Sequence, residues 1–154
     1  MKSISTKGFT IVEIIVVVTV IAILIGLVTV GMNRYLADGR DGQRKADVSI
    51  LGEYLENYYE DNGEYPSCDM LTADPTIVAN GTLKGIALDA LRSPSGATAN
   101  SIICSNITAS TAGDPYAYIG SGCGTAGTGY CMGWTLKYIQ EIDSTVVSIS
   151  SRRS

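Results

Sequence analysis

Histidine is absent from the 154 residues, and tryptophan and phenylalanine each occur once. Histidine is the commonest general base near neutral pH and a common zinc ligand, so its absence removes the residue on which many hydrolases and metal sites depend. Neither a P-loop motif nor a Cys-x-x-Cys motif occurs, so nothing indicates a nucleotide cradle or a zinc site. We therefore expect no enzyme activity, no metal and no cofactor.

A concentrated basic surface is lacking as well. The formal net charge is −4, and Arg40, Arg44 and Lys45 stand among acidic residues rather than in a basic patch. Proteins that bind nucleic acid usually gather lysine and arginine on one face. We therefore expect no direct contact with nucleic acid.

Charge is missing from one stretch altogether: no Asp, Glu, Lys or Arg occurs between Ile14 and Met32. A helix of about 19 residues rises roughly 28 Å, close to the thickness of a hydrocarbon core. Lys2 and Lys7 precede the stretch, and this positive flank predicts insertion with the N-terminus in the cytoplasm. Glu13 stands alone at the start of the apolar block, where a carboxylate is costly without a partner.

The residues around Glu13 form a specific pattern. Gly8-Phe9-Thr10-Ile11-Val12-Glu13, followed by the apolar run, resembles the class III signal of type IV pilins and pseudopilins. The resemblance implies that residues 1–8 are a leader, that a prepilin peptidase cuts after Gly8, and that the new N-terminal residue, Phe9, is N-methylated. It also implies that Glu13 meets the N-terminal amine of a neighbouring subunit. Such a pair supplies the missing partner through charge neutralisation and a hydrogen bond.

The helical pattern extends past the apolar block, so we predict one helix over residues 9–61. Its first part, 9–32, is the transmembrane or filament-core segment, and its second part, 33–62, is amphipathic. An apolar stripe recurs at helical spacing along the second part and predicts packing against a globular head at 63–154. The stripe consists of Val48, Leu51, Leu55 and Tyr58.

Glycines mark where this helix weakens and where it ends. Glycine costs a helix about 0.5–1 kcal/mol relative to alanine, so we predict a soft spot on assembly at Gly26 and Gly31. Asp61-Asn62-Gly63 predicts the end of the helix, because glycine readily adopts the left-handed conformation of a C-terminal cap. The string over residues 55–66 contains this exit and resembles the helix exit of pseudopilins and related bacterial pilins.

The head is predicted to be a small antiparallel β-sheet packed on the helix, which makes an α+β fold of type IV pilin-like architecture. Strands are expected at 116–119, 130–139 and 145–149. Residues 67–112 look like loops, apart from one short helical segment at 86–91. Alternation along the second strand puts five large residues on one buried face. They are Tyr130, Met132, Trp134, Leu136 and Tyr138.

Four cysteines lie beyond the apolar block, which fits an oxidising outer compartment. They allow three connectivities. Cys123 and Cys131 bracket the glycine-rich loop at 120–129 and can face each other at its base. Cys68 and Cys104 would then tie the helix exit to the middle loop. Loop geometry therefore favours Cys68–Cys104 and Cys123–Cys131, and each disulfide would contribute about 2–4 kcal/mol to a small head.

The resemblance implies a structural subunit, major or major-like, of a bacterial type IV pilus. Such a subunit is held in the inner membrane first, then polymerises with other pilin subunits into an extracellular filament for adhesion, twitching motility or DNA uptake. Its implied partners are the prepilin peptidase and an inner-membrane assembly platform with its ATPases, since this chain has no nucleotide motif.

Two alternatives stay open at this point. Within the family, the chain could be a pseudopilin of a type II secretion system. In another class, it could be a membrane-tethered extracellular binding module, which would keep its leader. A tethered enzyme would need a nucleophile with a base or a metal, and no such set can be assembled from these residues.

Overall fold

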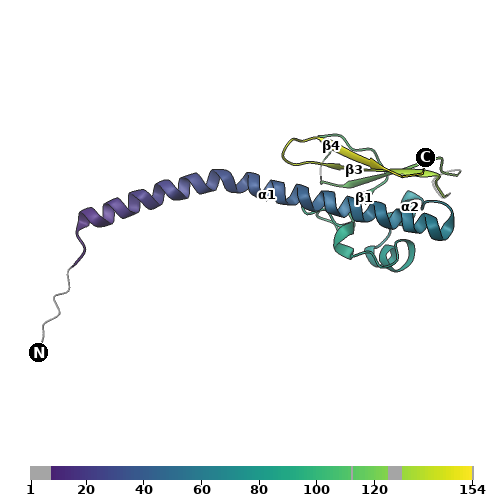
Figure 1. The fold of residues 1–154 in the computed structure, drawn as a ribbon, viewed down its shortest axis with the longest axis horizontal. Helices are drawn as coiled ribbons and strands as arrows, with labels where there is room; N and C mark the ends of the chain where they lie inside the picture. The colour runs from purple at the N-terminus through teal and green to yellow at the C-terminus, as the bar shows by residue number, and fades with distance from the viewer. Residues whose placement is uncertain (1–7, 112, 125–129, 154) are drawn as a thin grey trace, which may run out of the picture. The chain divides into compact units, whose positions relative to one another are not determined.

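A computed structural model of the protein describes residues 8–111, 113–124 and 130–153. The chain divides into two compact units, Met1–Leu36 and Ala37–Ser154. We call the second unit the head. Helix α1, Ile11–Asn62, supplies the first unit and one side of the head. The remaining elements all belong to the head (Figure 1): α2 (Cys68–Leu71), α3 (Pro75–Ile77), η1 (Val78–Thr82), η2 (Leu88–Leu91), β1 (Ile102–Ile103), β2 (Tyr116–Ser121), β3 (Gly133–Ile139) and β4 (Val146–Ser150).

The strands form one four-stranded sheet in the order β1-β2-β3-β4. β3 pairs antiparallel with both β2 and β4, whereas β1 pairs parallel with β2 through Ile102 and Tyr116. The α+β fold class is thus confirmed, but the prediction of an antiparallel sheet is wrong, because the sheet is mixed. β1 has only two residues, which is too short for an alternating pattern to reveal it in the sequence.

The core lies between the sheet and the second part of α1, which run alongside each other in Figure 1. The stripe Val48, Leu51 and Leu55 is confirmed, since each side chain is 1% exposed, whereas Tyr58 is half-buried. From β3, alternate residues point into this core. They are Trp134, Leu136 and Tyr138.

The predicted buried face is wrong at its beginning, because β3 starts only at Gly133. Tyr130 and Met132 are exposed, and Cys131 between them is buried. The backbone of Cys131 exchanges hydrogen bonds of 2.8 and 2.9 Å with Tyr65 in an isolated bridge. This bridge and the disulfide turn Cys131 inward, and so reverse the alternation before the strand begins.

The helix exit follows the predicted chemistry. α1 ends at Asn62, and Gly63 adopts a left-handed φ of +79° while its N–H donates to the carbonyl of Tyr59 at 2.7 Å. This arrangement satisfies one of the carbonyls that every helix end leaves open. The segment expected to be loops holds α2, α3 and η1 in addition to η2, and these turns are too short for a periodic signal. Residues 125–129 of the glycine-rich loop lie outside the described residues.

One glycine sets how closely β3 approaches α1. A Cβ built on Gly52 would lie 3.1 Å from Cη2 of Trp134 and 3.4 Å from Cδ1 of Ile149. The indole ring therefore rests directly on the helix backbone at this position. Gly42, ten residues earlier on α1, is exposed, and nothing lies within 4 Å of its Cβ position.

We expect opposite effects from filling these two positions. Gly52→Val should lower the free energy of unfolding by about 1–3 kcal/mol, because it overpacks a filled contact. Gly42→Ala should raise it by about 0.5–1 kcal/mol, because it improves helix propensity in open space. Urea unfolding of the micelle-bound chain, followed by the fluorescence of Trp134, measures both. Equal effects of the two substitutions would contradict the close contact at Gly52.

A buried guanidinium joins α1 to one end of the sheet, where β2 begins and β3 ends. The side chain of Arg44 is 2% exposed, and it donates to Oδ1 of Asp41 at 2.6 Å and to Oδ2 of Asp114 at 2.7 Å. Asp41 in turn accepts the backbone N–H groups of Glu141 and Ile142, at 2.8 and 3.1 Å. The turn between β3 and β4 is thereby held to the helix by charge-assisted hydrogen bonds.

Glu141 completes this cluster at its exposed rim. Its carboxylate accepts from Nε of Arg40 at 2.8 Å and from Arg44 at 3.3 Å. Hydrogen bonding from Arg40, with a smaller contribution from Arg44, lowers the pKa of Glu141 to about 2. The folded state therefore favours the ionised carboxylate more strongly than the unfolded chain does.

The sign of the pH dependence follows from this lowered pKa. Glu141 stabilises the fold fully above its ordinary pKa of 4.5, and that stabilisation is lost as the pH falls towards about 2. Between these two pH values, we expect the free energy of unfolding of Glu141→Gln to fall less steeply with falling pH than that of the wild type. Asp143→Asn is the matched control, since that exposed carboxylate in the same turn has no partner among the described residues. A Glu141→Gln profile as steep as that of Asp143→Asn would contradict the assignment.

Candidate functional site

The first unit exposes its apolar side chains in every direction. All described side chains from Ile11 to Val28 are exposed, and so is Met32. Among the described residues, α1 is the one helix long and apolar enough to cross a membrane, and none of its apolar window is buried. The core helix of a soluble protein would be mostly buried, so this surface needs a cover that the described chain does not supply.

The start of α1 contains a reciprocal hydrogen-bonded cap. Oε2 of Glu13 accepts from the backbone N–H and from the hydroxyl of Thr10, both at 2.8 Å, and the N–H of Glu13 donates to Oγ1 of Thr10 at 3.3 Å. Because the helix begins at Ile11, Thr10 is the N-cap and Glu13 is the third helical residue, the arrangement of a capping box.

Sequence reasoning missed this cap, although Thr10-x-x-Glu13 before an apolar run is its signal. Glu13 is therefore not without a partner in the single chain. Both bonds reach the same oxygen, and Oε1 accepts no hydrogen bond from the described residues. The cap therefore orients the carboxylate and leaves one oxygen for a further donor.

The predicted processing site lies just before the helix. Gly8 and Phe9 are exposed and non-helical, and the side chain of Phe9 is 85% exposed. Backbone of this kind is accessible to a peptidase, whereas a helical peptide bond is not. Gly26 and Gly31 both lie inside α1, so the soft spot stays a prediction about the assembled state.

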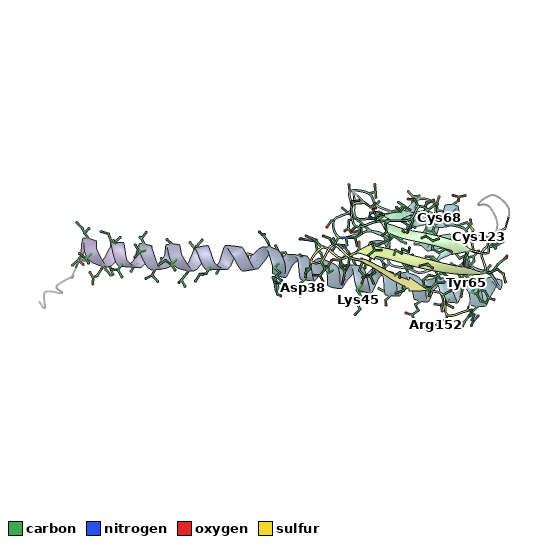
Figure 2. The ribbon with its side chains drawn as sticks, turned by 90° about the horizontal axis from the view of Figure 1, so that it is seen from above. Asp38, Lys45, Tyr65, Cys68, Cys123 and Arg152 are labelled. Atoms are coloured by element: carbon green, nitrogen blue, oxygen red, sulfur yellow. A yellow bond between two sulfur atoms is a disulfide. The ribbon has the colours of Figure 1, made fainter. Side chains whose placement is uncertain are left out.

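The disulfides close the end of the head where α1 stops. The structure joins Cys68 to Cys104 and Cys123 to Cys131, and Figure 2 places Cys68 and Cys123 at this end, near Tyr65. The second disulfide lies over Gly120, where a Cβ would come within 2.6 Å of both sulfur atoms. The first disulfide thus links the helix exit to the middle loop, and the second closes the glycine-rich loop at its base.

Known proteins add nothing to this description. No protein-family model, curated protein or solved structure matches the chain. Among the described residues, no group of cysteine, aspartate and glutamate side chains has the arrangement of a metal site. The chemistry that the first unit does offer is a capped carboxylate at the entrance of an uncovered apolar helix.

The cap predicts a local effect at residue 10. Thr10→Val keeps the shape of the side chain but removes the hydroxyl that bonds Glu13, which should cost the first turn about 1 kcal/mol. Amide hydrogen exchange of the micelle-bound chain should then quicken about fivefold at residues 12–14. Thr10→Ser, which restores the hydroxyl, is the control. Unchanged exchange in Thr10→Val would show that the cap does not hold the helix start.

Proposed function

We propose that the chain is a structural subunit of a bacterial type IV pilus, which polymerises through α1 after removal of residues 1–8. The observation that carries the proposal is the pairing of two features in one helix. The apolar surface of Ile11–Val28 lacks a cover in the single chain, and the carboxylate of Glu13 at its entrance keeps one oxygen unused.

A polar interaction is needed to favour the filament over the membrane, because both surround the apolar side chains with other apolar groups. Lipid tails and neighbouring helices shield leucine and valine about equally well, so apolar burial alone distinguishes the two states weakly. An α-amine at Phe9, created by cleavage after Gly8, carries a positive charge and several donors. Oε1 of Glu13 on a neighbouring subunit can accept it, and a charge-assisted bond in a dry bundle is strong.

The proposal also assigns partners and location. A prepilin peptidase removes the leader and methylates Phe9, and an inner-membrane platform with its ATPases extracts the subunit into the growing filament. The chain lies first in the cytoplasmic membrane and then on the cell surface. The disulfides suit the outer location, because they persist in oxidising compartments.

A pseudopilin of a type II secretion system is the second candidate. The string over residues 55–66, which resembles the helix exit of pseudopilins, favours it. A pseudopilus would use the same cleavage and the same Glu13 pairing. The two functions differ in where the polymer is found, since only a pilus is sheared from the outside of the cell.

We expect Glu13→Ala to insert into the membrane and to be cleaved normally, yet to enter filaments poorly. A charge-assisted hydrogen bond contributes about 1.5–3 kcal/mol, so the yield of sheared filaments should fall at least about tenfold. Immunoblots of sheared material and of the membrane fraction measure the two pools. The cells should be those that naturally make the protein.

The matched control is Glu53→Ala, which removes an exposed carboxylate on α1 that has no partner among the described residues. It should form filaments as the wild type does. Wild-type yield from Glu13→Ala would contradict the proposed pairing. Mass spectrometry of sheared fibres should find N-methylated Phe9, whereas an intact leader on mature protein would favour the tethered module.

A further inference from the structure

The head contains a groove beside the end of α1. It has a volume of about 700 Å³ and lies between the last turns of α1 and the segment 77–84. We call it the helix-exit groove. One wall presents Tyr54, Asn57, Tyr58 and Asp61, and the facing wall presents Ile77 and Lys84. The volume falls within the range of sites that bind small molecules.

Internal hydrogen bonds hold the walls of the groove in place. The hydroxyl of Tyr54 donates to the carbonyl of Gly85 at 3.0 Å, which ties the aromatic wall to the facing segment. The amide of Asn62 donates to the carbonyl of Tyr58 at 2.8 Å. Since these contacts exist in the free chain, the two walls of the groove are preformed.

Three polar side chains in the groove have no such contact. Asn57, Asp61 and Lys84 make no hydrogen bond or ion pair with the described residues. They supply an amide, a carboxylate and an ammonium group, which together can donate to and accept from hydroxyl groups. The charges of Asp61 and Lys84 cancel, so the lining is neutral overall.

We propose that the helix-exit groove binds a neutral saccharide of about disaccharide size. A sugar offers apolar C–H faces for aromatic rings and a rim of hydroxyls that both donate and accept. The lining of the groove contains both kinds of group, since Tyr54 and Tyr58 are aromatic and Asn57, Asp61 and Lys84 are polar. The site lies in the head and does not depend on the filament function. If the filament forms, its many copies of a weak site would together bind a saccharide-bearing surface more tightly than one site does.

Other ligand classes fit the lining less well. A phosphate or an acidic sugar would find one cation, Lys84, with the carboxylate of Asp61 in the same groove, which opposes a net anion. An extended peptide that binds by adding a strand needs a free sheet edge. The groove offers none, because its lining comes from α1, α2, α3, η1 and the two residues that follow η1.

The test uses the full chain in phosphocholine micelles, since a sugar-based detergent could occupy the groove. Maltose, lactose and N,N′-diacetylchitobiose are titrated separately up to about 50 mM, and N-acetylneuraminic acid, inorganic phosphate and triglycine serve as competing classes. Amide chemical shifts report the residue at which each compound binds. We expect at least one disaccharide to saturate shifts at residues 57, 61 and 84, with a dissociation constant of about 1–10 mM.

Variants on the two walls make the result specific. Asn57→Ala and Lys84→Ala, each an exposed position, should weaken disaccharide binding about fivefold or more. Asn80→Ala changes an exposed asparagine outside the lining and should leave binding unchanged. The proposal is overturned if no disaccharide shifts these residues, if only the anions or triglycine do so, or if both wall variants bind as the wild type does.

Discussion

Apolar surface in water costs about 25 cal/mol for each Å², and α1 leaves such surface uncovered from Ile11 to Val28. None of its apolar window is buried. The segment is long and apolar enough to cross a membrane, and under the proposed function lipid would cover it first and the helices of other subunits afterwards. In apolar surroundings, each polar group of the first unit needs a hydrogen-bond partner, either within the chain or from another molecule.

The cap at Thr10 gives the carboxylate of Glu13 hydrogen-bond partners within the chain. A free carboxylate at the entrance of an apolar helix would be costly, and bonds to the N–H and hydroxyl of Thr10 reduce the cost. Since these bonds engage only Oε2, the carboxylate is oriented without being saturated. The same two residues thus stabilise the single chain and leave an acceptor for the proposed contact between subunits.

The head differs from the first unit, because the apolar stripe on its part of α1 is covered by other segments of the same chain. The stripe at Val48, Leu51 and Leu55 belongs to one buried apolar cluster with residues of β2 and β3. Beside them, Arg44 gathers Asp41, Asp114 and Glu141 from three separate segments. Removing one partner of such a buried set leaves an uncompensated charge, so the cluster favours one placement of the turn after β3. The two disulfides then restrain the loops that the small core cannot hold.

Local rules written in the sequence determined the apolar block, the stripe on α1, the helix exit at Gly63 and most of the strands, because each depends on spacing or on one residue's backbone preference. The local pattern Thr10-x-x-Glu13 also predicts the cap, although the cap was not among our sequence-based predictions. Contacts between distant segments decided the rest: the parallel partner of β2, the inward turn of Cys131, the burial of Arg44 and the helix-exit groove. Arg44 shows why, since its charged neighbours in sequence suggest a solvated face, and only the approach of Asp114 and Glu141 makes its burial favourable. The spacing of residues along the chain does not show which distant segments come into contact.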